Sequence, residues 1–136
     1  MSDFRRVTDS LSVSPQVTEA DMVRAAAEGF VLVINNRPDG EDPSQPSSAT
    51  IEAAARAAGL DYVHVPVRGG PGPEQVEAVR LAIESAKGPV LAFCRSGTRS
   101  IVTWSIGQAL AGEADRETLV SQGAAAGYDL SGVLPG

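Results

Sequence analysis

The chain has 136 residues, of which 43% are hydrophobic and only 4% aromatic, and it carries a formal net charge of −6 at pH 7. This length suits one domain, residues 1–136, with its own hydrophobic core. The acidic balance argues against binding to nucleic acid or to an anionic membrane, because both require a basic protein surface.

Two further features of the sequence indicate a cellular compartment. The chain has one cysteine, so it cannot form an internal disulfide, which is typical of a reducing environment. It contains no apolar run of about 18 residues and no signal-peptide pattern. We therefore expect a soluble, cytoplasmic protein. The sequence does not indicate the oligomeric state.

The first part of the chain predicts a hairpin followed by a capped helix. Residues 4–7 and 11–14 are two short strands joined by a turn, which we expect to form an antiparallel start at one edge of a sheet. Residues 18–21 resemble a capping box, so a helix should extend from there to residue 28. Its predicted apolar face consists of Met22, Val23, Ala26 and Ala27.

Apolar runs and helical patterns then alternate to the end of the chain. Buried strands are predicted at 30–34, 62–67 and 90–93, and helices at 50–58, 74–86, 100–111 and 115–123, with a tail over 128–136. This alternation predicts an α/β fold with a central, mostly parallel sheet of about five strands and helices on both faces. Ligands of such sheets bind at the carboxyl ends of the strands, where the polar loops 35–48, 68–73 and 94–99 should meet.

The stretch Cys94-Arg95-Ser96-Gly97-Thr98-Arg99-Ser100 joins the last predicted strand to a helix. The first N–H groups of a helix lack intrahelical partners and lie at the positive end of its dipole, so they bind anions. A cysteine in this position, beside two arginines, should be stabilised as a thiolate nucleophile.

The remaining residues of this stretch have expected roles in holding an anion. The amides and side chains of Arg95, Ser96, Gly97, Thr98, Arg99 and Ser100 form the predicted anion site. Gly97 allows the backbone to turn inward, Arg99 can clamp an anion through two hydrogen bonds, and Ser100 can donate to the sulfur. The alternative is a buried structural cysteine.

Other candidate residues have weaker signals. His64 lies inside a predicted strand, which favours a core histidine over a catalyst. Arg37 follows a buried strand at the expected active end, where it could orient the cysteine loop, contact the anion or form a structural ion pair. Trp104 is expected in the core. No His, Cys or carboxylate cluster has metal-ligand spacing, so we expect no metal and no cofactor.

Two families share features with the cysteine stretch. It is similar to the short loop of rhodanese-type sulfurtransferases, since four residues separate Cys94 from Arg99, whereas protein-tyrosine and dual-specificity phosphatases have five. From Phe4 to about Val133, however, the chain resembles the phosphatase-like family of beta-lactamase hydrolase-like proteins, above all in residues 33–41 and in the cysteine stretch. This resemblance implies a dual-specificity-phosphatase-like fold.

The resemblance implies phosphatase chemistry, in which Cys94 attacks phosphorus and Arg99 holds the phosphoryl oxygens. Such enzymes take a general acid from the loop that here is 68–73, which has no carboxylate. Asp39, Glu41 or Asp42 could replace it, and we select Asp39, although a solvated turn aspartate is the simpler interpretation.

Two other functions stay open. A sulfurtransferase would carry a persulfide on Cys94 and would need no general acid. A binding module would hold an anion without turnover. The expected partner is accordingly a small anionic substrate, either a phosphate ester or a sulfane sulfur donor.

Overall fold

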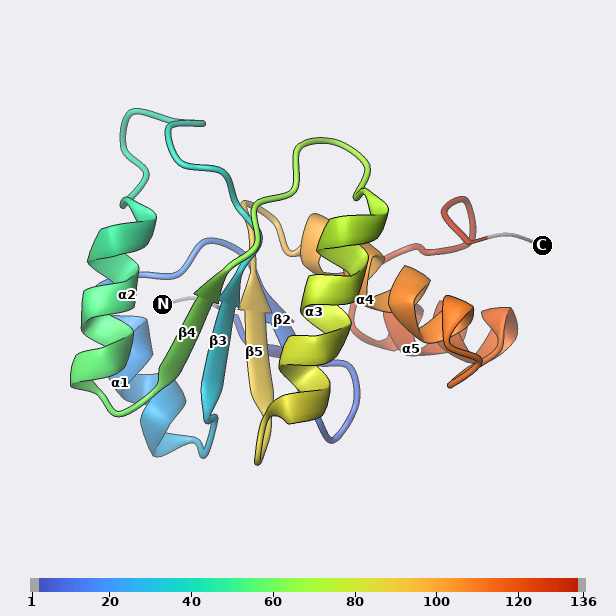
Figure 1. The fold of residues 1–136 in the computed structure, drawn as a ribbon, viewed down its shortest axis with the longest axis horizontal. Coiled ribbons are helices and arrows are strands. Elements are labelled where there is room, and N and C mark those ends of the chain that lie inside the picture. Colours follow the sequence, from blue (N-terminus) through green and yellow to red (C-terminus); the bar gives the residue numbers. More distant parts are fainter. Residues whose placement is uncertain (1–2, 135–136) are drawn as a thin grey trace.

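The computed structural model describes residues 3–134 and shows one five-stranded sheet between two layers of helices (Figure 1). The strands lie in the order β1-β2-β5-β3-β4. The elements are β1 (Arg5–Arg6), β2 (Leu11–Ser14), α1 (Glu19–Ala27), β3 (Leu32–Asn35), α2 (Ser48–Ala57), β4 (Asp61–His64), α3 (Pro73–Ser85), β5 (Val90–Phe93), α4 (Thr98–Leu110) and α5 (Arg116–Ala125).

The sheet is parallel except at its first strand. β1 pairs antiparallel with β2, as the hairpin prediction required, whereas the pairs β2–β5, β5–β3 and β3–β4 are parallel. Phe93 lies opposite both Ser14 and Asn35, and Asn35 lies opposite His64. The carboxyl ends of four strands therefore lie side by side.

Alternate residues of the central strands supply two separate cores. On the face covered by α1 and α2, Val33 and Leu91 pack with Met22 and Ile51. On the other face, neighbouring residues of the same strands pack against α3, α4 and α5, as Ile34 and Ala92 do. Burial on both faces explains why residues 32–34 of β3 and 90–93 of β5 are continuous apolar runs. The predicted α/β architecture with helices on both faces is confirmed.

The first helix is capped as predicted, but two residues of its predicted apolar face, Val23 and Ala27, are exposed. Thr18 and Asp21 form a capping box, in which the Thr18 side chain accepts from the Asp21 N–H and the Asp21 carboxylate accepts from the Thr18 N–H. Val23 is 66% exposed, and Ala25 is buried beside Met22 instead. The inward face is the i, i+3 pair at 22 and 25, and position 23 lies on another side of the helix.

The strand predicted at 62–67 is shorter than expected and lies at the edge of the sheet. β4 pairs only with β3, and regular pairing ends at His64. Val65 and Val67 still donate their N–H groups to Asn35 O and Asn36 O, while Pro66 between them has no N–H to donate. The segment after β4 is thus attached to the loop that follows β3.

The segment predicted as a tail packs against the body of the protein. Tyr128, Leu130 and Leu134 are buried in the core on the side of α4 and α5. The last two residues of the predicted tail, 135 and 136, lie outside the described part of the chain. No helix within residues 3–134 is long and apolar enough to cross a membrane.

Candidate active site

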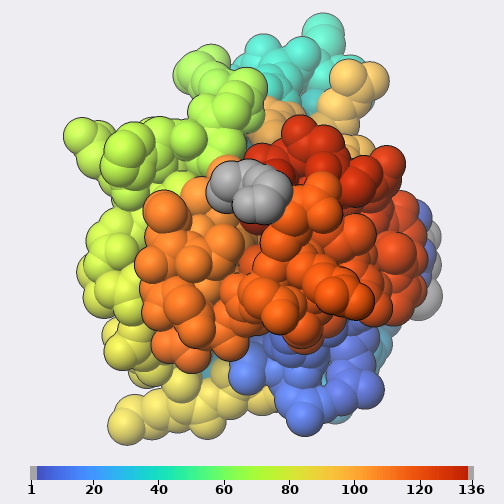
Figure 2. All heavy atoms as spheres, turned by 90° about the vertical axis from the view of Figure 1, so that its right-hand side faces the viewer, coloured from blue at the N-terminus to red at the C-terminus, as the bar shows by residue number. Residues whose placement is uncertain are grey.

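Three loops meet at the carboxyl end of the sheet, at the upper end of the strands in Figure 1. The loop after β3 bonds to the end of β5 through Asn36 N–H and Phe93 O, at 2.8 Å. The loop after β4 bonds to α4 through Val67 O and the Arg99 guanidinium, at 2.9 Å. The same three loops project together in the space-filling view (Figure 2). The site was predicted where these loops meet.

The cysteine lies at the base of this site. Cys94 follows β5 directly, and α4 begins four residues later at Thr98 with Gly97 as its N-cap. The Gly97 N–H donates to Cys94 Sγ at 3.1 Å, so one main-chain amide points at the sulfur. Cys94 is 0% exposed. The sulfur therefore lies against the amide of the helix N-cap and beneath the surface.

Arg99 is held at the loop by a carboxylate from another part of the chain. Its guanidinium donates to both oxygens of Glu41, at 2.7 and 2.8 Å, and to Val67 O. Hydrogen bonding to Glu41 raises the pKa of Arg99, and the charge on Cys94 acts in the same direction. The bidentate pair fixes the plane of the guanidinium beside the sulfur.

Glu41 is the partner of two arginines. Its carboxylate accepts from Arg99 and, at 3.0 Å, from Arg37 Nε. These hydrogen bonds, with that from Arg99 the strongest, lower the pKa of Glu41 to about 2. Glu41 is consequently ionised at neutral pH and has no proton to give to a leaving group, although its position in the loop had made it one candidate acid.

Arg37 lies behind this pair and is only 5% exposed. Besides Glu41, it contacts Gln16 Oε1 at 2.9 Å through Nη1. Its carbonyl oxygen is 2.8 Å from His64 Nε2, and its N–H donates to Asn35 Oδ1. The structure thus places Arg37 against the ion pair and places His64 against the Arg37 main chain.

The carboxylate selected as general acid is engaged with a helix. Asp39 Oδ1 accepts the Ser48 N–H at the start of α2, at 2.7 Å. Asp42, in the same loop, accepts from the N–H and hydroxyl of Ser44. The structure brings Cys94, Arg99 and Glu41 together, while the contacts of Asp39 connect it to α2.

The other residues of the cysteine stretch differ in exposure. Arg95, Ser96 and Thr98 are exposed, and the Ser96 hydroxyl donates to Thr98 Oγ1 at 3.0 Å. Ser100 is buried, and its hydroxyl has no hydrogen-bond partner. Arg95, Ser96 and Thr98 therefore form the outer rim of the predicted anion site, and Ser100 lies within it.

Tyr128 is a site residue that sequence reasoning missed. Its hydroxyl donates to Ser96 O at 2.8 Å, across 32 positions of sequence. The segment after α5 has no strand or helix periodicity, so its sequence predicts only a tail. The only available signal was an aromatic residue in a chain with few of them.

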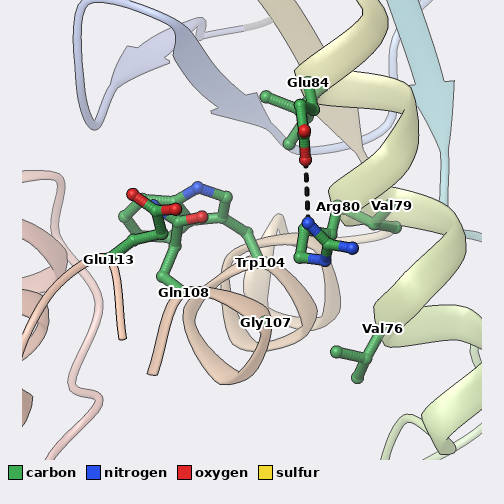
Figure 3. A pocket seen from close by; sticks show the side chains of 9 residues that line it. Val76, Val79, Arg80, Glu84, Trp104, Gly107, Gln108 and Glu113 are labelled. Carbon is green, nitrogen blue, oxygen red and sulfur yellow. Dashed lines mark hydrogen bonds and ion pairs between the residues drawn. The ribbon is translucent and has the colours of Figure 1, made fainter. Parts of the chain in front are cut away.

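A separate hollow of about 330 Å³ lies between α3 and α4 (Figure 3). Val76, Val79 and Trp104 form its apolar wall, and Arg80 reaches Glu84 across one side. No residue of the cysteine stretch lines it. This hollow is therefore distinct from the candidate site.

Comparison with protein families agrees with the resemblance inferred from the sequence. The model of the "Beta-lactamase hydrolase-like protein, phosphatase-like domain" family matches residues 3–111. The chain is 38% identical over 126 residues to the beta-lactamase hydrolase-like protein of Agrobacterium fabrum, and 37% identical over 125 residues to that of Xylella fastidiosa. The alignments cover 92% and 91% of this chain but 29% of each relative, so the chain spans less than a third of their length.

Solved structures show the same fold. A Neisseria meningitidis protein provisionally named a phosphatase superposes with a TM-score of 0.85 at 35% identity, covering 95% of this chain and 92% of that one. A variant of TpbA from P. aeruginosa, solved with phosphotyrosine, superposes with a TM-score of 0.63 at 15% identity, covering 90% and 74%. The second similarity concerns the fold alone.

Proposed function

Since the chain belongs to the phosphatase-like domain family of beta-lactamase hydrolase-like proteins, we propose that it is a cysteine-dependent phosphatase acting on small phosphate esters. The observation that carries this proposal is the placement of Cys94 Sγ, 3.1 Å from the Gly97 amide and beside Arg99. An amide and a guanidinium both favour the thiolate, which is the nucleophilic form of cysteine.

In the proposed reaction, Cys94 attacks phosphorus. The S–P bond forms as the P–O bond to the leaving group breaks, which yields a phosphocysteine. The amides of residues 95–99 and the Arg99 guanidinium hold the non-bridging oxygens. Water then attacks phosphorus, and the S–P bond breaks to release phosphate and restore the thiolate.

The leaving group determines which esters should react. Glu41 is ionised, and the Asp39 carboxylate, which the sequence favoured as the general acid, bonds to the Ser48 N–H of α2. A phenolate leaves with less help from a proton than an alkoxide does. We therefore propose aryl phosphates as the preferred substrates. The phosphotyrosine bound by the TpbA variant is an ester of this class.

The reaction also requires a movement. Because Cys94 has no exposed surface, a phosphoryl group reaches the sulfur only after the covering residues shift. Arg99 is one of the groups beside the sulfur, and it is tied to Glu41 and Val67. Substrate oxygens that take over some of these hydrogen bonds would compensate for the shift.

Sulfur transfer is the second candidate, favoured because Glu41, the carboxylate that bonds to Arg99 of the cysteine stretch, is ionised and has no proton to donate. The thiolate would take the outer sulfur of thiosulfate, forming a Cys94 persulfide and releasing sulfite. Cyanide would then accept that sulfur as thiocyanate and restore the thiolate. Neither step requires a proton donor. Anion binding without turnover is the third candidate.

One experiment separates the three functions. The protein and Cys94→Ser are each offered para-nitrophenyl phosphate and, separately, thiosulfate with cyanide. We expect nitrophenol release that falls by at least about 1,000-fold in the variant, because the attacking sulfur is lost. Thiocyanate without nitrophenol would establish sulfur transfer. If neither product formed, anion binding without turnover would be the remaining function.

Alkylation by iodoacetamide tests the nucleophile without a substrate. Cys94 is the only cysteine, so every label incorporated reports on it. We expect alkylation well below pH 8, whereas an ordinary thiol reacts mainly above about pH 8. Alkylation confined to the alkaline range would contradict the proposed thiolate.

A further inference from the structure

The peptide unit between Ser96 and Gly97 is held at both ends. Its N–H donates to Cys94 Sγ at 3.1 Å, and its carbonyl oxygen accepts from the Tyr128 hydroxyl at 2.8 Å. The N–H and C=O of one trans peptide point in opposite directions. A bond that fixes the carbonyl on one side therefore fixes the N–H toward the sulfur on the other.

Glycine at position 97 makes this restraint necessary. Gly97 has φ +93°, a value that residues with a side chain rarely adopt. A β-carbon there would overlap the Tyr128 hydroxyl, so only glycine allows the phenol to approach the loop. Glycine adopts positive and negative φ with similar ease, however, so it offers little resistance to rotation of the peptide before it.

Tyr128 is itself held in place and protonated. It is 8% exposed, and the Arg5 guanidinium lies over its ring, 5.2 Å from the centroid. Burial raises the pKa of Tyr128; Arg5 opposes this increase, and the charge on Cys94 adds to it. The phenol consequently keeps its proton at neutral pH and can donate it to Ser96 O.

We propose that Tyr128 is a positioning residue for the reaction of Cys94: its hydrogen bond to Ser96 O keeps the Gly97 N–H pointed at the sulfur. The inference rests on the proposed function, in which Cys94 reacts as a thiolate. Without the Tyr128 hydroxyl, the peptide can rotate and turn its carbonyl oxygen toward the sulfur. A carbonyl dipole in that position opposes the thiolate that the N–H stabilises.

We expect the other charged groups near Cys94 to stay in place when this hydroxyl is removed. Arg99 lies beside the sulfur from α4, with Glu41 behind it. The Arg5 guanidinium lies over the ring of Tyr128 and also acts on its hydroxyl, and Arg95 is exposed in the cysteine stretch. Tyr128→Phe keeps the ring and these charges while it removes the hydroxyl that donates to Ser96 O.

The test is the pH dependence of Cys94 alkylation by iodoacetamide in Tyr128→Phe. We expect the half-maximal rate to move up by about one pH unit, which is about tenfold slower labelling below the midpoint, because one hydrogen bond to a charged group is lost. The matched control is Tyr62→Phe, which removes a buried phenol hydroxyl bonded to Asn35 and Ser48. In Tyr62→Phe, the alkylation of Cys94 should show the same pH dependence as in the unaltered protein.

An unchanged midpoint in a folded Tyr128→Phe would overturn the inference. If that variant fails to fold, the unaltered protein still provides a test by NMR. The Gly97 amide proton should shift with pH at the midpoint of alkylation, and an amide that does not titrate would overturn the inference. Alkylation requires no phosphatase substrate, so the role of Tyr128 can stand even if no phosphate ester is hydrolysed.

Discussion

At the scale of single residues, three carboxylates in one short loop have different partners and therefore different chemistry. Asp39 accepts a main-chain N–H of α2, Glu41 accepts from two guanidinium groups, and Asp42 accepts from Ser44. Hydrogen bonds from Arg99 and Arg37 lower the pKa of Glu41, and those from Ser44 lower the pKa of Asp42, so both are poor proton donors. The partner, more than the residue type, decides which carboxylate could act as an acid.

Substitutions at Asp39 separate its two possible roles. Asp39→Asn keeps an oxygen that can accept the Ser48 N–H but cannot deliver a proton, whereas Asp39→Ala removes both functions. We expect the rate of para-nitrophenyl phosphate hydrolysis by Asp39→Asn to stay within about twofold of the rate of the unaltered protein. We expect Asp39→Ala to lower the free energy of unfolding by about 1 kcal/mol, as loss of a helix cap does. Steady-state kinetics and urea unfolding measure the two effects. A tenfold or greater loss of turnover in Asp39→Asn would instead assign the proton donor to Asp39.

At the scale of elements, an ion-pair network joins segments that the sheet brings together. Glu41, in the loop after β3, bonds to Arg99 on α4 and to Arg37, which in turn bonds to Gln16 beyond β2. Arg37 is buried, so its charge would be costly without a partner. The network therefore fixes the loop and the helix of the site relative to one another.

Glu41→Gln should destabilise the protein in a pH-dependent way. We expect a loss of about 1–3 kcal/mol in the free energy of unfolding at pH 7, typical of hydrogen bonds to charged groups. The pKa of Glu41 is lowered from 4.5 to about 2 in the folded protein. Its contribution is thus fully present above pH 4.5 and is lost as the pH falls toward 2. Urea unfolding at several pH values should show the two proteins converging over this range.

The exposed pair of Glu52 and Arg56 on α2 provides the control for this prediction. Glu52→Gln removes the same charge from a solvent-exposed pair, and we expect a change below about 0.5 kcal/mol. Equal effects of the two substitutions would mean that the Glu41 network contributes no more than a surface ion pair.

At the scale of the whole molecule, the first strand and the segment after α5 meet beside the cysteine loop. The segment after α5 carries Tyr128, whose ring contacts Arg5 of β1 and whose hydroxyl contacts Ser96. In Figure 2 this segment, in red, lies above the orange residues of α5, and the blue N-terminal hairpin lies at the bottom of the view. Leu130 anchors the segment in the core and packs closely on Gly123, where a β-carbon would lie 2.8 Å from Leu130 Cγ.

Leu130→Ala should loosen the packing of the segment after α5 against the core. Leu130 is fully buried, so its truncation should lower the free energy of unfolding by about 2–5 kcal/mol through lost burial and a residual cavity. Val133→Ala in the same segment is the control, and because Val133 is exposed it should cost less than about 1 kcal/mol. Urea unfolding of both variants checks the prediction, and similar small costs would show that the segment is not part of the cooperative core.

Local patterns in the sequence determined the architecture. The apolar runs at 30–34 and 90–93 predicted strands because a strand buried on both faces needs apolar residues throughout. The Thr18–Asp21 capping box predicted the start of α1 because its hydrogen bonds join residues three positions apart. The stretch from Cys94 to Arg99 lies between a predicted strand and a predicted helix. Because these residues are close in sequence, the stretch located the candidate site without the structure.

Only the tertiary structure decided which distant groups pair at that site. Arg99 and Glu41 are 58 positions apart, and Tyr128 and Ser96 are 32 apart, so no local period connects them. The sequence offered Asp39, Glu41 and Asp42 as acids and favoured Asp39, whereas the parallel order of β5, β3 and β4 brought Glu41 to the guanidinium. Hydrogen bonds depend on distances of about 3 Å, and such distances between remote residues exist only after the sheet has formed.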